Sequence, residues 1–149
     1  MKFVAGVGAS AGGLESLERF FRSIPLDSGV AYVVVQHLSA DHKSLMEELL
    51  GRFTRVPISE AKDGEELAPD HIYLLPPGKE LELRGTHLAV FDRDTERALS
   101  FPIDRMLTSL AEQHGPRAIA VILSGSGSDG SRGSAVGTRS ASSRATRGK

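Results

Sequence analysis

The sequence of 149 residues has no cysteine, no apolar run long enough to cross a membrane and a formal charge of only −1 at pH 7. The lack of cysteine excludes disulfide bonds, thiolate catalysis and cysteine-ligated zinc. The small net charge provides no overall attraction to nucleic acid or to a membrane surface. The apolar start of the chain is too short for a signal peptide. We therefore expect a cytoplasmic protein with no nucleic-acid partner and no membrane insertion.

The composition that remains is that of a soluble globular protein, with 40% hydrophobic and 25% charged residues. The length suits one domain. From Ser131 to Lys149 the chain is rich in serine, glycine, alanine and arginine, and Val136 is its only large aliphatic residue. Such a segment buries too little apolar surface to offset the entropy of ordering. We expect a domain over residues 1–130 and a disordered, low-complexity, basic tail over 131–149.

Hydrophobic patterning predicts strands that alternate with helices. Continuous apolar runs are typical of buried parallel strands, and residues 3–7, 30–35 and 118–123 form such runs. Weaker strands are predicted at 56–60 and 71–75, a hairpin at 81–91, and helices at 14–24, 43–53 and 102–114. This order predicts an α/β fold with an open, mostly parallel, doubly wound sheet, helices on both faces and a small β-hairpin.

Residues capable of chemistry follow three of the predicted strands. Ser10 lies among small residues between the first strand and the first helix, where a turn can expose a hydroxyl and unpaired N–H groups can stabilise negative charge. His37 comes directly after the second strand, and Asp129 lies in the loop after strand 118–123. Ligands of open α/β sheets bind beyond the carboxyl ends of the strands. We therefore expect the three side chains to meet at one edge of the sheet.

A serine, a histidine and an aspartate at one edge suit nucleophilic catalysis. Ser10 is the candidate nucleophile, His37 the general base and then acid, and Asp129 the carboxylate that orients the imidazole. Backbone N–H groups of the glycine-rich segments 11–13 and 125–127 are candidate oxyanion donors. This chemistry needs neither a metal nor a cofactor. The other histidines lack metal-ligand spacing and are interpreted as surface or structural residues: His42, His71, His87 and His114.

Each of the three residues also has a simpler interpretation. Ser10 fits a glycine-rich turn or helix cap, His37 fits an ordinary loop histidine, and Asp129 fits a turn before glycine. Residues 6–11 further resemble a dinucleotide-binding fingerprint, with alanine at the third glycine position. That fingerprint requires an acidic residue at the end of the second strand, where this chain has Gln36 and His37. Nucleotide binding therefore ranks below hydrolysis. Arg105, on the last predicted helix, could contact an acidic group of a substrate, but we interpret it as a solvated helix charge.

Three ordered segments resemble the catalytic domain of CheB-type protein-glutamate methylesterases of bacterial chemotaxis: residues 8–14, 34–37 and 123–130. The resemblance extends through 72–78 and 102–115 and covers roughly residues 3–130. Two further stretches are similar to variants fused to, or acting beside, a receptor methyltransferase, namely Ser-Ala-Gly-Gly-Leu-Glu and Pro-Ile-Asp-Arg. The resemblance implies hydrolysis of methyl-glutamyl esters on the cytoplasmic helices of chemoreceptors, with release of methanol, and in some members deamidation of glutamine.

The resemblance also implies particular roles and partners. It places the family's catalytic triad on Ser10, His37 and Asp129, and one oxyanion-hole position on Ser126. The candidate donors are therefore the backbone N–H of Ser126 and, from the first glycine-rich segment, those of Ala11 and Gly12. Ser126 stands where the family has methionine, and a backbone N–H survives that change. The implied partners are methylated chemoreceptor helices and a receptor methyltransferase, with no cofactor. The alternative is a catalytically silent module of the same fold that binds the receptor or the methyltransferase.

The chain departs from the family's pattern at both ends. No receiver domain precedes Met1, so the sequence predicts nothing about control by phosphorylation. After the Asp-Gly motif the family continues with a helix and further strands, which residues 131–149 do not resemble. Without those elements, strand 118–123 is expected to lie at an exposed edge of the sheet, which lowers stability.

Overall fold

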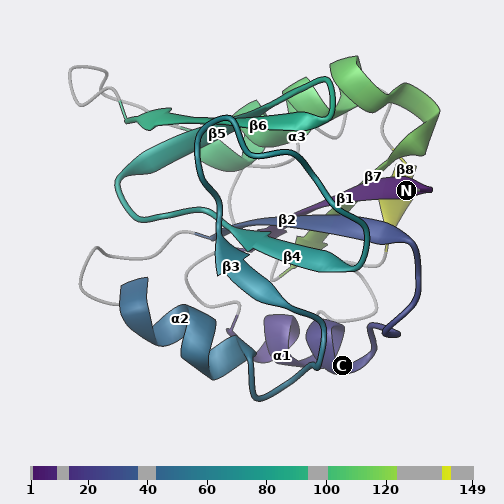
Figure 1. The fold of residues 1–149 in the computed structure, drawn as a ribbon, viewed down its shortest axis with the longest axis vertical. Helices are drawn as coiled ribbons and strands as arrows, with labels where there is room; N and C mark the ends of the chain where they lie inside the picture. Colours follow the sequence, from purple (N-terminus) through teal and green to yellow (C-terminus); the bar gives the residue numbers. More distant parts are fainter. Residues whose placement is uncertain (1, 10–13, 37–42, 94–100, 124–138, 142–149) are drawn as a thin grey trace.

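The computed structural model describes residues 2–9, 14–36, 43–93, 101–123 and 139–141. A six-stranded sheet has helices on both sides, and a two-stranded hairpin packs beside it (Figure 1). The main sheet has the strand order β3-β4-β2-β1-β7-β8, and its strand pairs are parallel. Its strands are β1 (Phe3–Ala9), β2 (Val30–Gln36), β3 (Ile58–Glu60), β4 (His71–Leu74), β7 (Ala118–Leu123) and β8 (Arg139–Ala141). The predicted α/β architecture is confirmed.

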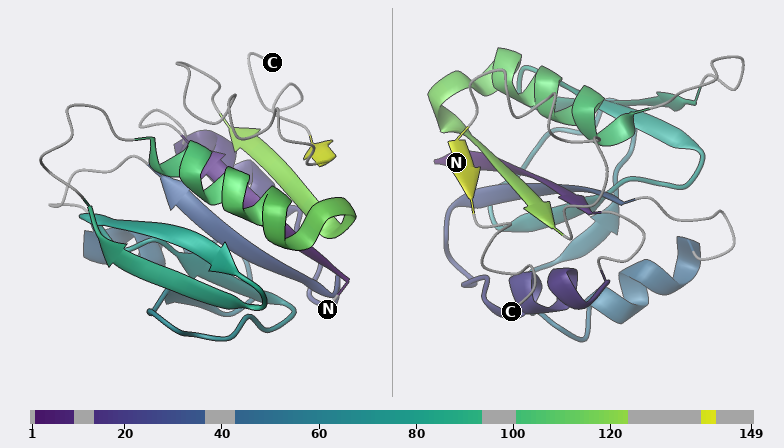
Figure 2. Two further views of the ribbon diagram at one scale, coloured as in Figure 1. Left: turned by 90° about the horizontal axis from the view of Figure 1, so that it is seen from above. Right: turned by 180° about the vertical axis from the view of Figure 1, so that it is seen from behind.

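Two layers cover the sheet (Figure 2). The helices α1 (Leu14–Arg22) and α2 (Lys43–Leu50) cover one face. The other face carries α3 (Pro102–His114) and the antiparallel hairpin of β5 (Lys79–Arg84) and β6 (His87–Asp92). Because side chains alternate along a strand, β2 supplies Val33 and Val35 to the core beneath α3 and Val34 to the core beneath α1. Burial on both faces explains why β2 is apolar without interruption.

Two glycines of β1 let α3 approach the sheet closely. A Cβ atom at Gly6 would lie 2.6 Å from the sulfur of Met106, and one at Gly8 would lie 2.4 Å from Cγ2 of Ile103. Both separations are well below van der Waals contact, and both partners are buried. The glycines that suggested a nucleotide fingerprint therefore have a packing role against α3.

Hydrogen bonds close the amino-terminal edge of the sheet. The carboxylate of Asp70, just before β4, accepts a hydrogen bond from the backbone N–H of Gly29 at 2.9 Å and one from the Ser28 hydroxyl at 3.3 Å. The Ser28 hydroxyl also lies 2.9 Å from the phenolic oxygen of Tyr32. Burial raises the pKa of Tyr32, against the lowering effect of that hydrogen bond. Asp70 itself holds a positive φ of 58°, which aspartate tolerates better than most residues.

The observed elements differ from the predicted ones mainly at their ends. The helix predicted for 14–24 ends at Arg22, and the one predicted for 43–53 ends at Leu50, where single turns follow. The strand predicted for 56–60 contains only Ile58–Glu60. One difference is larger, because β8 lies within the segment 131–149, where no strand was predicted. β7 therefore pairs with β1 on one side and β8 on the other, and the expectation that it forms an exposed edge is wrong.

Candidate active site

Three strands end at the same level of the carboxyl edge. Ala9 is the last residue of β1, and its register partners are Gln36, the last residue of β2, and Leu123, the last residue of β7. Neighbouring strands lie about 4.8 Å apart, so the chain leaves the sheet at three adjacent points. The sheet therefore brings together the starting points of the segments that carry the predicted catalytic residues.

Along the chain, the predicted catalytic residues come after these strand ends. Ser10 follows Ala9 and His37 follows Gln36 along the chain, while Asp129 belongs to the segment that begins after Leu123. All three residues lie outside the described residues, as do the predicted oxyanion residues Ala11, Gly12 and Ser126. Their roles remain predictions.

The amino end of α1 lies at the same edge. The helix begins at Leu14, shortly after the end of β1, and runs antiparallel to that strand to Arg22 (Figure 2). The positive end of its backbone dipole therefore faces the carboxyl edge. Leu17 and Phe21 are fully buried and hold the helix against the sheet. An edge of this kind favours a reaction in which negative charge develops on an oxygen atom.

Gln36 is a polar residue at this edge that the sequence analysis did not assign a role. Its carboxamide oxygen Oε1 is buried, and it accepts no hydrogen bond from the part of the chain that the structure describes. A buried acceptor without a donor costs free energy, about 1–3 kcal/mol in proteins. The sequence feature that could have indicated a role for Gln36 is its position, because it is the polar residue that ends an apolar strand directly before His37.

The described histidines outside the site make local contacts. His71 Nε2 lies 2.8 Å from the hydroxyl of Ser59, and its ring packs against Tyr73 with the ring centroids 4.5 Å apart. His114 Nε2 lies 2.8 Å from the carbonyl oxygen of Gly85. His87 is exposed on the hairpin, and His42 lies outside the described residues. These contacts agree with the interpretation of His71, His87 and His114 as surface or structural residues.

Arg105 is not the solvated charge that was expected. Its guanidinium contacts Glu80 at 2.7 Å and Glu82 at 3.0 Å, both on β5. The same group lies over the ring of Phe91 on β6, 5.4 Å from its centroid. Because Glu80 is buried, this ion pair fastens the hairpin to α3. Helical periodicity alone could not show that a strand would supply acidic partners.

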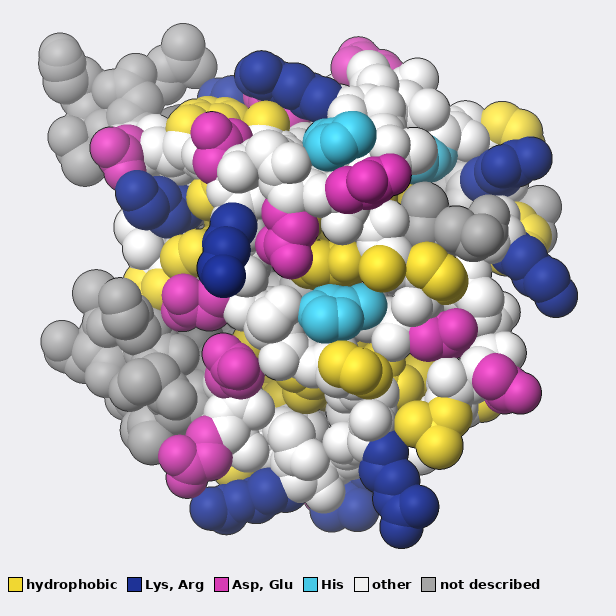
Figure 3. Space-filling view, in the orientation of Figure 1, with side chains coloured by type: hydrophobic (Ala, Val, Ile, Leu, Met, Phe, Trp, Pro, Cys, Tyr) yellow, Lys and Arg dark blue, Asp and Glu magenta, His cyan; other side chains and the backbone are white. Residues whose placement is uncertain are grey.

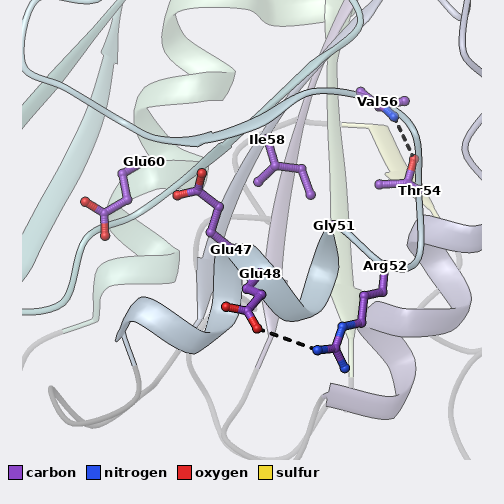
Figure 4. A pocket seen from close by; sticks show the side chains of 8 residues that line it. All are labelled: Glu47, Glu48, Gly51, Arg52, Thr54, Val56, Ile58 and Glu60. Atoms are coloured by element: carbon purple, nitrogen blue, oxygen red, sulfur yellow. Dashed lines mark hydrogen bonds and ion pairs between the residues drawn. The ribbon is translucent and has the colours of Figure 1, made fainter.

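An open cleft of about 690 Å³ lies between α2 and β3, and no residue of β1 or β2 lines it (Figure 4). Glu47 and Glu60 line it, together with Glu48 and Arg52, which form an ion pair at 3.5 Å. On the face shown in Figure 3, acidic and basic side chains are interspersed.

The described residues contain no group of three or more metal-ligating side chains placed to hold an ion. Within the described ranges, no helix is both long and apolar enough to span a membrane.

Comparison with known proteins agrees with this geometry. A solved structure, the CheB methylesterase catalytic domain of Thermotoga maritima, superposes with a TM-score of 0.82 at 28% identity and covers 91% of this chain and 74% of its own. A protein-glutamate methylesterase/protein-glutamine glutaminase 1 of Xanthomonas campestris is 35% identical over 131 residues, which are 85% of this chain and 36% of the relative. A protein-glutamate methylesterase/protein-glutamine glutaminase 3 of Geobacter sulfurreducens is 34% identical over 137 residues, 89% of this chain and 37% of the relative.

The chain thus spans less than two fifths of the length of these two curated relatives. The family model described as CheB methylesterase matches residues 5–139, so the match runs past residue 130 and reaches the start of β8. With its parallel sheet, the helices on both faces and the agreement over nearly its whole length, the chain belongs to the CheB methylesterase family.

Proposed function

We propose that this chain hydrolyses the methyl esters of glutamyl side chains on chemoreceptors, by a Ser-His-Asp mechanism that uses no cofactor. The observation that carries the proposal is the alignment of Ala9, Gln36 and Leu123 at one edge. It supports a site in which Ser10, His37 and Asp129 converge. Membership of the CheB methylesterase family supports the same reaction.

In this mechanism the Ser10 hydroxyl attacks the carbonyl carbon of the ester, and His37 accepts the hydroxyl proton. Asp129 accepts a hydrogen bond from the imidazole and stabilises its cation. The oxyanion of the tetrahedral intermediate accepts hydrogen bonds from the backbone N–H groups of Ala11, Gly12 and Ser126. His37 then donates its proton to the leaving oxygen, and methanol departs.

The second half of the reaction regenerates the enzyme. A water molecule attacks the acyl carbon, and His37 accepts its proton. The intermediate collapses, His37 returns a proton to the Ser10 oxygen, and a glutamate carboxylate is released. A glutamine side chain follows the same path with ammonia as the leaving group. The expected substrate lies on cytoplasmic receptor helices, so the proposed location is the cytoplasm and the proposed partners are the receptor and a receptor methyltransferase.

Methanol release from a methylated receptor tests this function. The Ser10→Ala variant is expected to release none above background, because it lacks the attacking oxygen. Ser59→Ala is the matched control, since Ser59 also contacts a histidine at 2.8 Å but on β3 rather than at the carboxyl edge. The control is expected to retain hydrolysis.

Equal release by wild type and Ser10→Ala would contradict the proposal. Receptor binding without turnover by the wild type would instead support the catalytically silent module.

A further inference from the structure

Gln36, the last residue of β2, carries a side-chain carboxamide whose oxygen is unsatisfied among the described residues. Gln36 Oε1 is buried, and no donor in the described part of the chain reaches it. The residue as a whole remains partly exposed. A glutamine amide carries two donors on nitrogen and an acceptor oxygen, and rotation about its last side-chain bond exchanges them. No hydrogen bond from the described residues to Oε1 opposes that exchange.

The Gln36 side chain lies next to the last residue of β1, which directly precedes the proposed nucleophile in the chain. Val34, two residues earlier on β2, faces the core beneath α1, so Gln36 faces the same side of the sheet. Its neighbour across the parallel ladder is Ala9, which precedes Ser10 and also faces that core. The small side chain of Ala9 occupies little of the space beside the amide. The amide thus lies beside Ala9, the last described residue before Ser10, on the side of the sheet that α1 covers.

The two substrates of a methylesterase that is also a glutaminase differ in hydrogen bonding at the leaving group. The methoxy oxygen of a glutamyl ester can only accept a hydrogen bond, whereas the NH₂ group of glutamine donates. A site with a fixed donor would favour the ester, and one with a fixed acceptor would favour the amide. A carboxamide, which can turn either its nitrogen donor or its oxygen acceptor towards the leaving group, would suit both substrates.

We propose that Gln36 is a specificity-determining residue, whose reversible amide lets the site accept both methyl-glutamyl ester and glutamine side chains. With the ester bound, the Gln36 nitrogen donates to the leaving-group oxygen. With glutamine bound, Oε1 accepts from the substrate NH₂ group. The inference rests on the proposed function and names the substrate pair of that same site.

The ratio of the two hydrolysis rates tests this assignment. The ionised carboxylate introduced by Gln36→Glu accepts hydrogen bonds but donates none. At a pH where it is ionised, we expect the amide-to-ester ratio of kcat/KM to rise about tenfold, the factor of one hydrogen bond. The methionine side chain in Gln36→Met neither donates nor accepts a comparable hydrogen bond. The rates of ester and amide hydrolysis are therefore both expected to fall by about tenfold.

Gln113 provides the matched control, because it is the only other glutamine and lies at the opposite end of the fold on α3. Its Oε1 accepts a hydrogen bond from the backbone N–H of Gly85 at 2.6 Å. Gln113→Glu and Gln113→Met are expected to leave the ratio and both rates at the edge unchanged. An unchanged ratio in Gln36→Glu, with unchanged rates in Gln36→Met, would overturn the assignment.

A binding measurement separates this inference from the proposed function. In the Ser10→Ala background, receptor peptides with a methyl-glutamyl or a glutamine side chain are titrated calorimetrically against the protein. Gln36→Glu is expected to raise the relative affinity for the glutamine peptide even if the wild type turned over neither substrate. An unaltered affinity ratio would refute the role of Gln36 whether or not the esterase function holds.

Discussion

Among the described residues, the amino and carboxyl edges of the sheet differ in how completely their polar groups are paired. At the amino edge, Asp70 accepts hydrogen bonds from Gly29 and Ser28, and the N–H of Lys2 donates to the carbonyl of Gly29 at 2.9 Å. At the carboxyl edge, the buried oxygen of Gln36 has no donor among the described residues. The candidate nucleophile and base follow strands that end at the carboxyl edge, and no candidate catalytic residue follows the amino edge.

This difference indicates that the amino edge mainly stabilises the fold and the carboxyl edge mainly serves binding and chemistry. Polar groups whose hydrogen bonds are formed within the protein contribute to the free energy of folding and have no free donor or acceptor for a ligand. Unsatisfied groups lower stability and are retained where a ligand completes them, which is why departures from good packing and pairing concentrate at functional sites. Substitutions of polar residues at the amino edge should therefore lower the free energy of unfolding without changing the rate of hydrolysis. Substitutions of polar residues at the carboxyl edge should change the rate with little effect on the free energy of unfolding.

The largest expected effect is at the carboxyl edge. His37→Ala removes the proposed general acid and base, and we expect kcat/KM for ester hydrolysis to fall by up to about 10,000-fold. The free energy of unfolding, measured in urea, is expected to change by less than about 0.5 kcal/mol. A large loss of stability with little loss of activity would reverse the comparison between the edges.

Gly8→Ala tests how β1 is held beneath the site. The added Cβ would meet Cγ2 of Ile103 at 2.4 Å, so we expect a loss of about 1–3 kcal/mol of unfolding free energy from overpacking. Because Ala9 and Ser10 follow directly, a displaced strand end should also lower the rate of hydrolysis. Chemical denaturation and methanol release measure the two effects.

The partner substitution Ile103→Ala distinguishes a steric cause from a loss of backbone freedom. If the clash is responsible, the double variant is destabilised by less than the sum of the two single variants. Additive effects would show that Ile103 is not the obstacle.

Asp70→Ala is expected to be the next in size. It removes the acceptor for Gly29 and Ser28, and we expect the unfolding free energy to fall by about 1–2 kcal/mol. Asp70→Asn keeps an acceptor oxygen and tolerance of a positive φ, so it should cost less. Hydrolysis by the folded protein should be normal in both variants. A large decrease in kcat would mean that the amino edge is coupled to the reaction.

The smallest effect concerns the two tyrosines, which are the only ones in the chain. Burial raises the pKa of Tyr73, opposed by the hydrogen bond from the Ala68 N–H, and burial likewise raises that of Tyr32. An unfolded tyrosine ionises with a pKa of about 10, so the neutral phenols stabilise the fold fully below that pH. This stability is lost as the pH rises through the folded-state pKa values. Absorbance titration of the native protein should show no phenol ionising at or below the unfolded value.

The order of the elements was predictable because it depends on short-range patterns. The apolar run at 30–35 and the helical spacing of Ile103, Met106 and Leu107 each indicate one element without reference to the rest of the chain. The end of α2 was less predictable, since apolar Phe53 extends the helical pattern but follows Leu50 in a separate turn. β8 was not predictable, because its pairing with β7 comes from the sheet and not from its own composition.

The candidate site was only partly accessible from sequence. The positions of Ser10 and His37 after apolar runs could be recognised, because a strand end is a local feature. Gln36 could not be given a role, since burial of its amide depends on the neighbouring strands. Arg105 was misassigned for the same reason, because its partners Glu80 and Glu82 come from a distant strand.

The sequence by itself determined which segments become strands and helices, and that polar, reactive side chains follow the strands. Those properties arise from side-chain periodicity and backbone preferences within a few residues. Only the tertiary structure decided the strand order β3-β4-β2-β1-β7-β8 and the common level at which Ala9, Gln36 and Leu123 end. Register and order are set by burial of apolar surface between segments far apart in the chain, such as α3 against the glycines of β1.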